Sequence, residues 1–370
     1  MKRIMILSLI LVLGFSFASL TEAKEGEVRF TGITMTSDTY MLGVGWSNVI
    51  KKYLPGVKMT VLAKGGTTKL LRGMVNKKWE TAYIGSPHLE CAKKGILLFE
   101  KEKAYSKERY YDPTRALFAI VTGWCNYPVR ADSDIRFIGD LKGKRVHFGN
   151  PGGFGGIMTQ GVLKAHGLDL DKGDYKAMYL KTSQAIDQLR DKAGLDDALV
   201  WGGIPQPLIV DLSLKTPVRL ISMTKEGWNR FQKEFVVGPY TLLKTLSPQE
   251  LNEAYKGGVV NTEPVYTWSV PLMVVVRKEM DEKLIYDMVK VFWEHLDEVK
   301  TVSKQLETLT LEGAVQNLSA PFHPGALKYY KEIGAVKKTR KEGSPQGLPS
   351  FHLLPGNPRT PEHYYWVWID

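Results

Sequence analysis

The chain has 370 residues, of which 44% are hydrophobic and 24% charged, proportions that are typical of a globular protein and argue against intrinsic disorder. At this length two compact units are expected rather than one. The formal net charge of +11 favours anionic solutes or surfaces, but the Lys and Arg residues are scattered along the chain, which argues against nucleic acid as a partner.

The first residues have the pattern of a secretory signal peptide. Two basic residues precede an apolar stretch over residues 4–17, which is shorter than the roughly 18 apolar residues that a spanning helix needs. Cleavage is expected after Ala23 or, as an alternative, after Ala18. We therefore predict a signal peptide over residues 1–23 and an exported, periplasmic protein that does not itself span the membrane.

The first part of the remaining chain alternates strand and helix patterns. Strand patterns cover residues 28–34, 57–63 and 82–85, and helical patterns occupy the intervals between them. Ser37 or Asp38 is placed to cap the first helix. The β-α-β-α-β order predicts a mainly parallel sheet flanked by helices.

The later elements predict a second lobe inserted into the first. The chain is predicted to leave the first lobe near residues 123–128 and to return to it near 222–226. Residues 270–277 then form a strand pattern. Two further helices are expected, an amphipathic one over 281–300 and a second over 303–318. The predicted domains are lobe 1 (24–127 plus 223–335), lobe 2 (128–222) and a C-terminal tail (336–370).

Three short apolar runs end at a small or glycine-rich turn and then open into a helix, over residues 28–39, 57–68 and 144–156. Such a turn leaves backbone N–H groups at a helix N-terminus, where an anion is favoured. In open α/β sheets these turns lie at the carboxyl ends of strands, where ligands bind. The pattern indicates capture of a small anionic molecule outside the cytoplasm.

Motifs for metal, cofactor and nucleophile chemistry are missing from the sequence. It contains no H-x-x-x-H pair, no C-x-x-C, no G-x-S-x-G and no Walker lysine motif, so we expect no metal, no cofactor and no enzymatic activity. The sequence has two cysteines, Cys91 and Cys125, which is too few for a fold held together by disulfides. The spacing between them leaves open whether they form a disulfide or lie buried as free thiols.

Several segments carry a resemblance to a known family. They are P-F-H-P-G-A at 321–326, Y-Y-K-E-I-G at 329–334, D-L-K-G-K-R-V at 140–146 and G-G-I-P at 202–205. Over residues 28–334 the chain resembles the TAXI family of TRAP-transporter solute-binding proteins. Two loops that contact ligand in that family differ here: S-D-T-Y at 37–40 replaces G-T-Y-Y, and G-G-F-G-G at 152–156 replaces G-S-G-T.

The resemblance implies a two-lobed α/β fold of the periplasmic-binding-protein type II class, with mainly parallel sheets flanked by helices and a hinge between the lobes. It also implies small carboxylate ligands such as glutamate or 2-oxo acids, and TRAP membrane permease subunits as partners. The expected ligand-binding residues are Ser37, Thr39, Tyr40, Gly65, Gly66, Thr67 and Ser86 in lobe 1, and Gly152, Gly153, Phe154, Gly155, Trp201 and Gly203 in lobe 2.

Each of these residues has a structural alternative. Ser37 serves equally as a helix cap, Gly65 as a positive-φ turn and Trp201 as a core side chain. His323, inside the resembling segment, is expected to fix a turn rather than to contact solute.

The leading hypothesis is a non-catalytic receptor that closes around an organic acid or amino acid and is then recognised by a permease. A periplasmic sensor that passes ligand state to a membrane signalling partner uses the same closing device and remains the alternative. An enzyme on this scaffold would need an acid/base pair in the cleft, such as Asp38 with His147.

Overall fold

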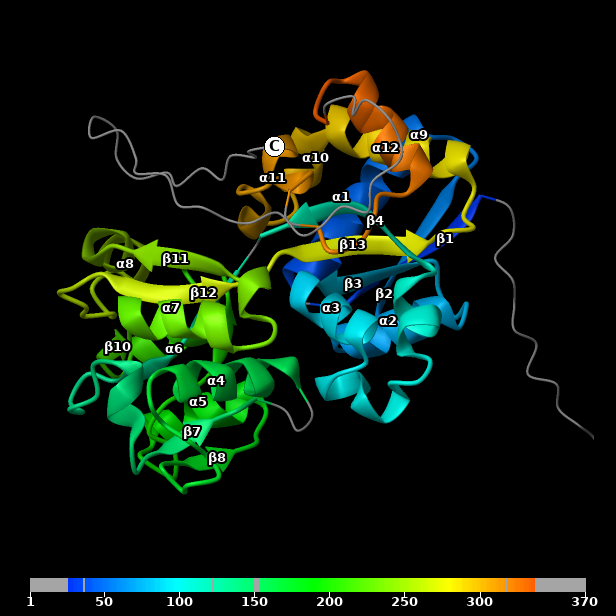
Figure 1. Ribbon diagram of the computed structural model, residues 1–370. Coiled ribbons are helices and arrows are strands. Elements are labelled where there is room, and N and C mark those ends of the chain that lie inside the picture. Colours follow the sequence, from blue (N-terminus) through cyan, green and yellow to red (C-terminus); the bar gives the residue numbers. More distant parts are fainter. Residues whose placement is uncertain (1–25, 36, 122, 150–152, 317, 337–370) are drawn as a thin grey trace, which may run out of the picture.

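The computed structural model describes residues 26–336, apart from 36, 122, 150–152 and 317. The predicted signal peptide, and the predicted tail from residue 337 onward, lie outside the described residues. Figure 1 shows two α/β lobes: one combines the blue and cyan N-terminal segments with the orange C-terminal helices, and the other is green to yellow. None of the helices in the described ranges combines the length and the apolar character that a membrane crossing requires.

The first lobe has a parallel pair of strands beside a three-stranded sheet. The pair is β1 (Glu27–Gly32) with β2 (Lys58–Ala63), and the sheet has the order β3 (Thr81–Gly85), β13 (Leu272–Arg277), β4 (Thr114–Ile120). Helices α1 (Asp38–Tyr53), α2 (Thr67–Val75), α3 (Ser86–Lys94), α9 (Glu282–Glu294) and α12 (Pro324–Glu332) flank these strands.

The core of this lobe is aromatic. The Trp46 ring of α1 packs within 5.5 Å of Phe118 on β4 and 5.1 Å of Phe292 on α9, measured between ring centroids. Its Nε1 donates a hydrogen bond to the carbonyl of Met288 at 3.0 Å. N-terminal and C-terminal segments are therefore joined around one buried side chain.

Strand direction differs from the predicted mainly parallel arrangement. β13 runs antiparallel to both β3 and β4, and only the β1–β2 and β7–β8 pairs are parallel among the described strand pairings. The physical reason is the path of the chain, because β13 enters this sheet from the second lobe and so runs opposite to strands that enter from the first.

Among the described residues, the second lobe has four two-stranded pairs and five α-helices. The pairs are β5 (Trp124–Asn126) with β9 (Val200–Gly202), β6 (Pro128–Arg130) with β10 (Val218–Leu220), β7 (Arg145–His147) with β8 (Lys176–Met178), and β11 (Leu242–Leu246) with β12 (Val265–Ser269). The helices are α4 (Phe154–Ala165), α5 (Thr182–Arg190), α6 (Pro207–Ser213), α7 (Lys225–Glu234) and α8 (Pro248–Tyr255).

Residues 225–269 pack on the second lobe, although the sequence prediction placed residues from 223 onward in the first. Leu246 and Leu251 share a buried core with Ile186 of α5 and Leu212 of α6. Figure 1 shows α7, α8, β11 and β12 in the green-to-yellow lobe. These contacts favour a return crossing near residue 270 instead of 222–226, because the apolar side chains of β11 and α8 are buried there.

The C-terminal helices are shorter than predicted. The expected helix over 281–300 divides at His295 into α9 and α10 (Leu296–Lys300). Among its described residues, the expected helix over 303–318 contains only the 3-10 turn η5 (Lys304–Leu306) and α11 (Leu311–Ala314). Thr310 accepts a hydrogen bond from the Gly313 N–H at 3.2 Å and so begins a new helix inside the predicted one.

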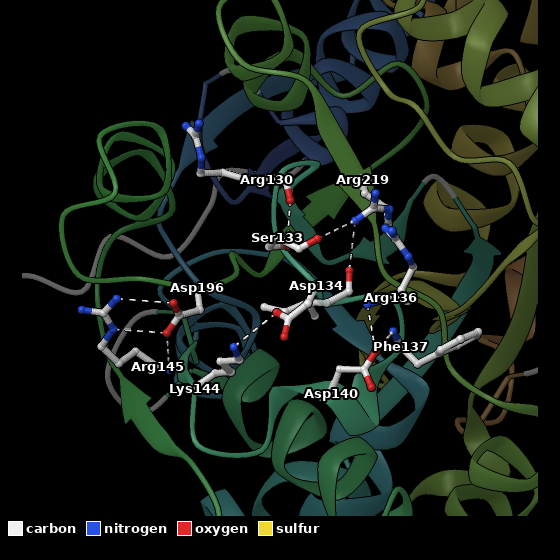
Figure 2. A network of polar contacts seen from close by, with 11 residues as sticks. Arg130, Ser133, Asp134, Arg136, Phe137, Asp140, Lys144, Arg145, Asp196 and Arg219 are labelled. Atoms are coloured by element: carbon white, nitrogen blue, oxygen red, sulfur yellow. Dashed lines mark hydrogen bonds and ion pairs between the residues drawn. The ribbon is translucent and has the colours of Figure 1, made fainter.

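The segment D-L-K-G-K-R-V at 140–146 has a structural role, shown in Figure 2. The Asp140 carboxylate accepts hydrogen bonds from the backbone N–H groups of Arg136 and Phe137, both at 2.8 Å. The Arg219 guanidinium donates to three carbonyls of the preceding turn, among them that of Ser133 at 3.3 Å. The segment at 140–146 therefore stabilises the start of η3 (Ile138–Leu141). It does not line the cavity described below.

Both cysteines are buried free thiols, so the alternative without a disulfide is confirmed. Burial raises the pKa of Cys91 to about 12 and that of Cys125 well above its usual range.

Candidate functional site

A cavity of about 540 Å³ opens where the two lobes meet along helix α2. Most of its wall comes from the first lobe, from α2, the start of α3, and η1 (Leu97–Glu102). The second lobe contributes the start of α4. The lining residues are Gly66, Thr67, Thr68, Lys69, Arg72, Gly73, Asn76, Lys78, Trp79, His88, Leu98, Gly153 and Phe154.

Three helices begin at this cavity without a capping side chain. Gly66, Gly85 and Gly153 are the N-cap residues of α2, α3 and α4, and none of the three helices has a side-chain hydrogen bond at its cap. The first N–H groups of a helix have no intrahelical acceptor, and the N-terminal end of the helix dipole is positive. Two of these starts line the cavity directly, and α3 contributes His88. The arrangement favours an anion.

One contact across the lobes lies in the wall of the cavity. The Phe154 ring of α4 lies over the His88 imidazole of α3, with the ring centroids 3.6 Å apart. His88 Nε2 in turn shares a hydrogen bond with Thr67 Oγ1 at 3.0 Å. One residue from each of the three helix starts is thus linked in a chain of direct contacts.

The His88 imidazole is neutral at physiological pH. Burial lowers the pKa of His88 to about 3, because the charged form would lose its hydration. Its Nδ1 is buried and has no hydrogen-bond partner among the described residues. The ring therefore adds a neutral side chain to the cavity wall.

Cationic side chains stand along the same wall. Lys69, Arg72 and Lys78 line the cavity, and its described lining residues include no Asp or Glu. Arg72 Nη2 donates to Glu102 Oε2 at 3.1 Å, which neutralises part of this charge from outside the lining. The wall remains net positive, and opposite charge in a partly enclosed site attracts an anionic ligand.

The structure brings four of the predicted site residues together at this cavity: Gly66 and Thr67 from lobe 1, and Gly153 and Phe154 from lobe 2. Gly65 shapes the turn before them. It has a φ of +98°, which glycine adopts without strain, and its N–H donates to the Ile33 carbonyl at 3.0 Å.

Two further predicted glycines are Gly155 and Gly152, and the described lining does not include Gly155. Gly155 packs on Leu199, since a Cβ atom there would lie 3.0 Å from Leu199 Cδ2. Gly152 lies outside the described residues.

The β1–α1 turn is occupied by its own hydrogen bonds. Ser37 Oγ accepts from the Tyr40 N–H at 3.3 Å and lies 2.8 Å from Thr39 Oγ1, and Thr39 is fully buried. Thr39 Oγ1 also accepts from the Ile33 N–H at 3.1 Å. Ser37, Thr39 and Tyr40 are not in the cavity lining, and the geometry favours the capping alternative for Ser37.

Three predicted residues lie near the crossings without lining the cavity. Ser86 is buried in the first turn of α3, where its N–H donates to the Pro271 carbonyl at 2.9 Å. Trp201, at the centre of β9, is half-buried and packs on Trp268 with centroids 5.7 Å apart. Gly203 directly follows β9.

Asp38 and His147, the example of an acid/base pair, are not brought together at the cavity. The His147 ring is buried in the second lobe, where Nδ1 accepts from the Leu199 N–H and Nε2 bonds to the Leu180 carbonyl, both at 3.0 Å. Asp38 accepts from the Thr39 N–H at 2.8 Å. Neither residue lines the cavity.

His323 confirms the prediction that it fixes a turn. It is the N-cap of α12, its Nδ1 accepts from the Gly325 N–H at 3.3 Å, and its Nε2 bonds to the Met280 carbonyl at 3.1 Å.

Sequence reasoning missed the polar face of α2 and His88. Lys69, Arg72 and Asn76 follow one another at intervals of three and four residues, opposite the buried Leu70, Leu71 and Met74. That spacing was visible as the outward stripe of an amphipathic helix. No local feature of the sequence indicated that a second wall of a cavity faces this polar stripe.

Comparison with known proteins supplies a family. The model of the NMT1-like family matches residues 31–334.

Among solved structures, the chain is similar to three binding proteins. The periplasmic aliphatic sulphonate binding protein SsuA from Escherichia coli has 12% identity and a TM-score of 0.43, covering 82% of each chain. A TRAP periplasmic solute binding protein from Desulfovibrio salexigens with bound orotic acid has 12% identity and a TM-score of 0.43, covering 84% of each chain. A binding protein component of an ABC phosphonate transporter from Pseudomonas aeruginosa has 12% identity and a TM-score of 0.43, covering 76% of this chain and 79% of that one.

All three TM-scores are below 0.5, so we draw neither fold nor function from these likenesses. The family match stands independently of them, because it extends over more than half of the sequence. The chain belongs to the NMT1-like family.

Proposed function

We propose that this protein is an extracytoplasmic solute-binding protein that captures a small organic acid between its lobes and delivers it to a membrane permease. The observation that carries the proposal is the cavity at which residues from both lobes meet, with uncapped helix starts and cationic side chains on its wall. A site shared between lobes couples binding to closure, since a ligand that contacts both lobes stabilises the closed form.

The chemistry of the wall selects the ligand class. Backbone N–H groups at the starts of α2 and α4 are preorganised donors for a carboxylate, and Thr67 adds a hydroxyl group. The neutral His88 ring holds the Thr67 hydroxyl group at 3.0 Å and adds no charge to the wall. An organic acid fits these donors better than an organic cation does.

A TRAP-type permease of the TAXI class is the proposed partner. The segments 140–146 and 321–334 support this finer assignment through their resemblance to that family. A permease gene beside the gene for this chain would favour transport, and a histidine-kinase gene there would favour the sensing alternative.

Binding is tested by titrating the purified protein with organic acids and amino acids while following tryptophan fluorescence and melting temperature. At least one acid is expected to raise the melting temperature in a concentration-dependent way. The absence of a response to every acid and amino acid would contradict the proposal.

Thr67→Asp tests the location of the site. A carboxylate in the first turn of α2 favours the helix dipole, so the fold is retained, but it repels an anionic ligand at the same place. The affinity for the identified acid is expected to fall at least about tenfold, equivalent to about 1.4 kcal/mol. Ser247→Asp, which places the same charge at the start of α8, is the matched control and leaves affinity unchanged.

A further inference from the structure

The cavity extends well beyond the helix starts. Its lining follows α2 from Gly66 to Asn76 and ends at Lys78. A helix rises about 1.5 Å per residue, so the ten steps from Gly66 to Asn76 correspond to roughly 15 Å. The volume of about 540 Å³ lies in the range of sites that hold drug-sized ligands. A single small carboxylate at the helix starts would leave the far end of this space unused.

The middle of the cavity is apolar and fixed in place. The Trp79 ring lies directly against Gly73, where a Cβ atom would come within 1.8 Å of a ring carbon. Trp79 Nε1 donates to the Leu70 carbonyl at 2.8 Å, which holds the indole alongside α2. Leu98 of η1 is a second apolar lining residue. This section suits a hydrocarbon or other apolar body rather than a charged group.

Cations also line the cavity beyond the helix starts. The Arg72 guanidinium is positioned by Glu102, at 3.1 Å, and by the Phe99 ring, whose centroid lies 5.7 Å away. Its Nε atom is buried and has no hydrogen-bond partner among the described residues. Lys78 adds an exposed ammonium group, and its backbone N–H is anchored on the Gly73 carbonyl at 2.9 Å.

The C-terminal end of α2 does not cancel this positive charge. Anions are disfavoured at helix C-termini by the unpaired carbonyl groups there. The Asn76, Lys77 and Lys78 N–H groups donate to the carbonyls of Arg72, Met74 and Gly73, at 3.2, 3.0 and 2.9 Å. These bonds occupy three of the last carbonyls, so the side-chain cations dominate the local charge.

From this sequence of polar, apolar and polar sections we infer a second, distal anion subsite formed by Arg72 and Lys78, and an elongated dianion as the ligand. The inference rests on the proposed function and deepens it. One anionic group binds at the starts of α2 and α4, an apolar body lies along Trp79 and Leu98, and a second anionic group meets Arg72 and Lys78.

Four probes of matched chemistry test the inference: propionate and octanoate with one carboxylate, succinate and suberate with two. Affinity is measured by calorimetry on the full purified chain. Suberate is expected to bind at least about tenfold more tightly than octanoate, because only suberate supplies a charge to the distal subsite. It also binds more tightly than succinate, which is too short to reach both ends.

Lys78→Gln is expected to remove about tenfold of the suberate affinity and to leave propionate and succinate affinity unchanged. Lys77→Gln removes the same charge one residue away, outside the cavity lining, and is the control. Both lysines are exposed, so neither variant is expected to unfold the protein, and melting temperatures check this.

The outcomes separate the two proposals. If suberate binds no more tightly than octanoate, or if the Lys78 and Lys77 variants behave alike, the distal subsite is wrong while the solute-binding function stands. If none of the four acids nor any other acid or amino acid binds the wild-type chain, the solute-binding function is contradicted and the distal subsite falls with it.

Discussion

His88 shows how one buried side chain links ligand chemistry to acid stability. The imidazole is held between Thr67 and Phe154, one from each lobe, and burial lowers its pKa to about 3. A histidine with this pKa stays neutral through the whole physiological range. It therefore positions the Thr67 hydroxyl group at the cavity without adding a pH-dependent charge.

The same burial makes His88 a source of acid sensitivity. In the unfolded chain a histidine takes up a proton near pH 6.5, whereas the folded chain holds His88 neutral down to about pH 3. Between those values the unfolded state binds more protons, so the stability of the fold decreases as pH falls. This contribution is fully present above about pH 6.5 and is lost as pH falls towards 3.

We expect His88→Gln to weaken this dependence. The difference in unfolding free energy between wild type and variant should shift by roughly 2–3 kcal/mol in favour of the variant between pH 7.5 and 4.5. Urea unfolding at both pH values measures it. The other buried histidines titrate in both proteins and cancel in the difference, so an unchanged difference would show that His88 is not buried as described.

Residues of the cavity divide into those that local sequence reveals and those that it hides. Gly66 and Gly153 were predictable, because a glycine between an apolar run and a helical pattern is a local signal. His88 and Lys78 were not, because their position at the cavity depends on α3 and η1 packing beside α2. Thr39 was predicted at the site for its hydroxyl group, and that group is bonded inside its own turn.

At the scale of elements, helix α2 combines two tasks. Its buried side packs on the sheet through Leu70, Leu71 and Met74, and its other side forms the floor of the cavity. Gly73 connects the two, because only a residue without a side chain lets the Trp79 ring approach the helix so closely.

Gly73→Ala is therefore expected to destabilise the protein although alanine is the better helix former. The added methyl group would overlap the indole ring, and such overpacking costs about 1–3 kcal/mol. Gly66→Ala at the N-cap of this helix is the control: no atom lies within 4 Å of its Cβ position, so no overlap is added and the expected cost is a capping loss of at most about 1 kcal/mol. Urea unfolding of the two variants compares them, and equal stabilities would contradict the packing described.

The elements that prediction missed share a physical cause. Residues 303–318 have the hydrophobic periodicity of a single helix, but Ser303 and Thr310 cap two separate turns within this range. The boundary at 222 followed a local turn, whereas the hairpin of β11 and β12 buries Leu246 and Val265 in the second core. Both depend on contacts between segments distant in sequence, which a single-sequence pattern does not contain.

At the scale of the whole molecule, two kinds of contact bear on how the lobes are connected. Beside the crossings, the outgoing and returning segments are bonded to each other within the second lobe: Trp268 Nε1 donates to the Tyr127 hydroxyl group at 3.0 Å, and Thr267 donates to the Cys125 carbonyl. At the cavity, Phe154 lies on His88. The first kind is buried and suited to a hinge, whereas the second sits in the cavity wall and is exchangeable for ligand contacts.

Phe154→Ala is expected to shift the ligand-free protein towards a more open form. Removing the ring deletes a contact between the lobes while leaving the contacts near the crossings intact. Small-angle X-ray scattering should give a larger radius of gyration for the variant, and addition of the identified ligand should reduce it. Phe137→Ala, an exposed phenylalanine on the same lobe, is the control, and identical scattering of the two variants would argue against an interlobe role for Phe154.

The place of β13 in the first sheet also sets the order in which the molecule can fold. β3 and β4 do not pair with each other, and the strand that lies between them emerges from the ribosome only after the whole green-to-yellow lobe. Trp46 packs on Phe292, which is also synthesised only after that lobe. A nascent chain therefore keeps β3, β4 and Trp46 without these partners until β13 and α9 have been synthesised, a delay that keeps this part of the chain accessible to chaperones and to machinery that threads unfolded polypeptides.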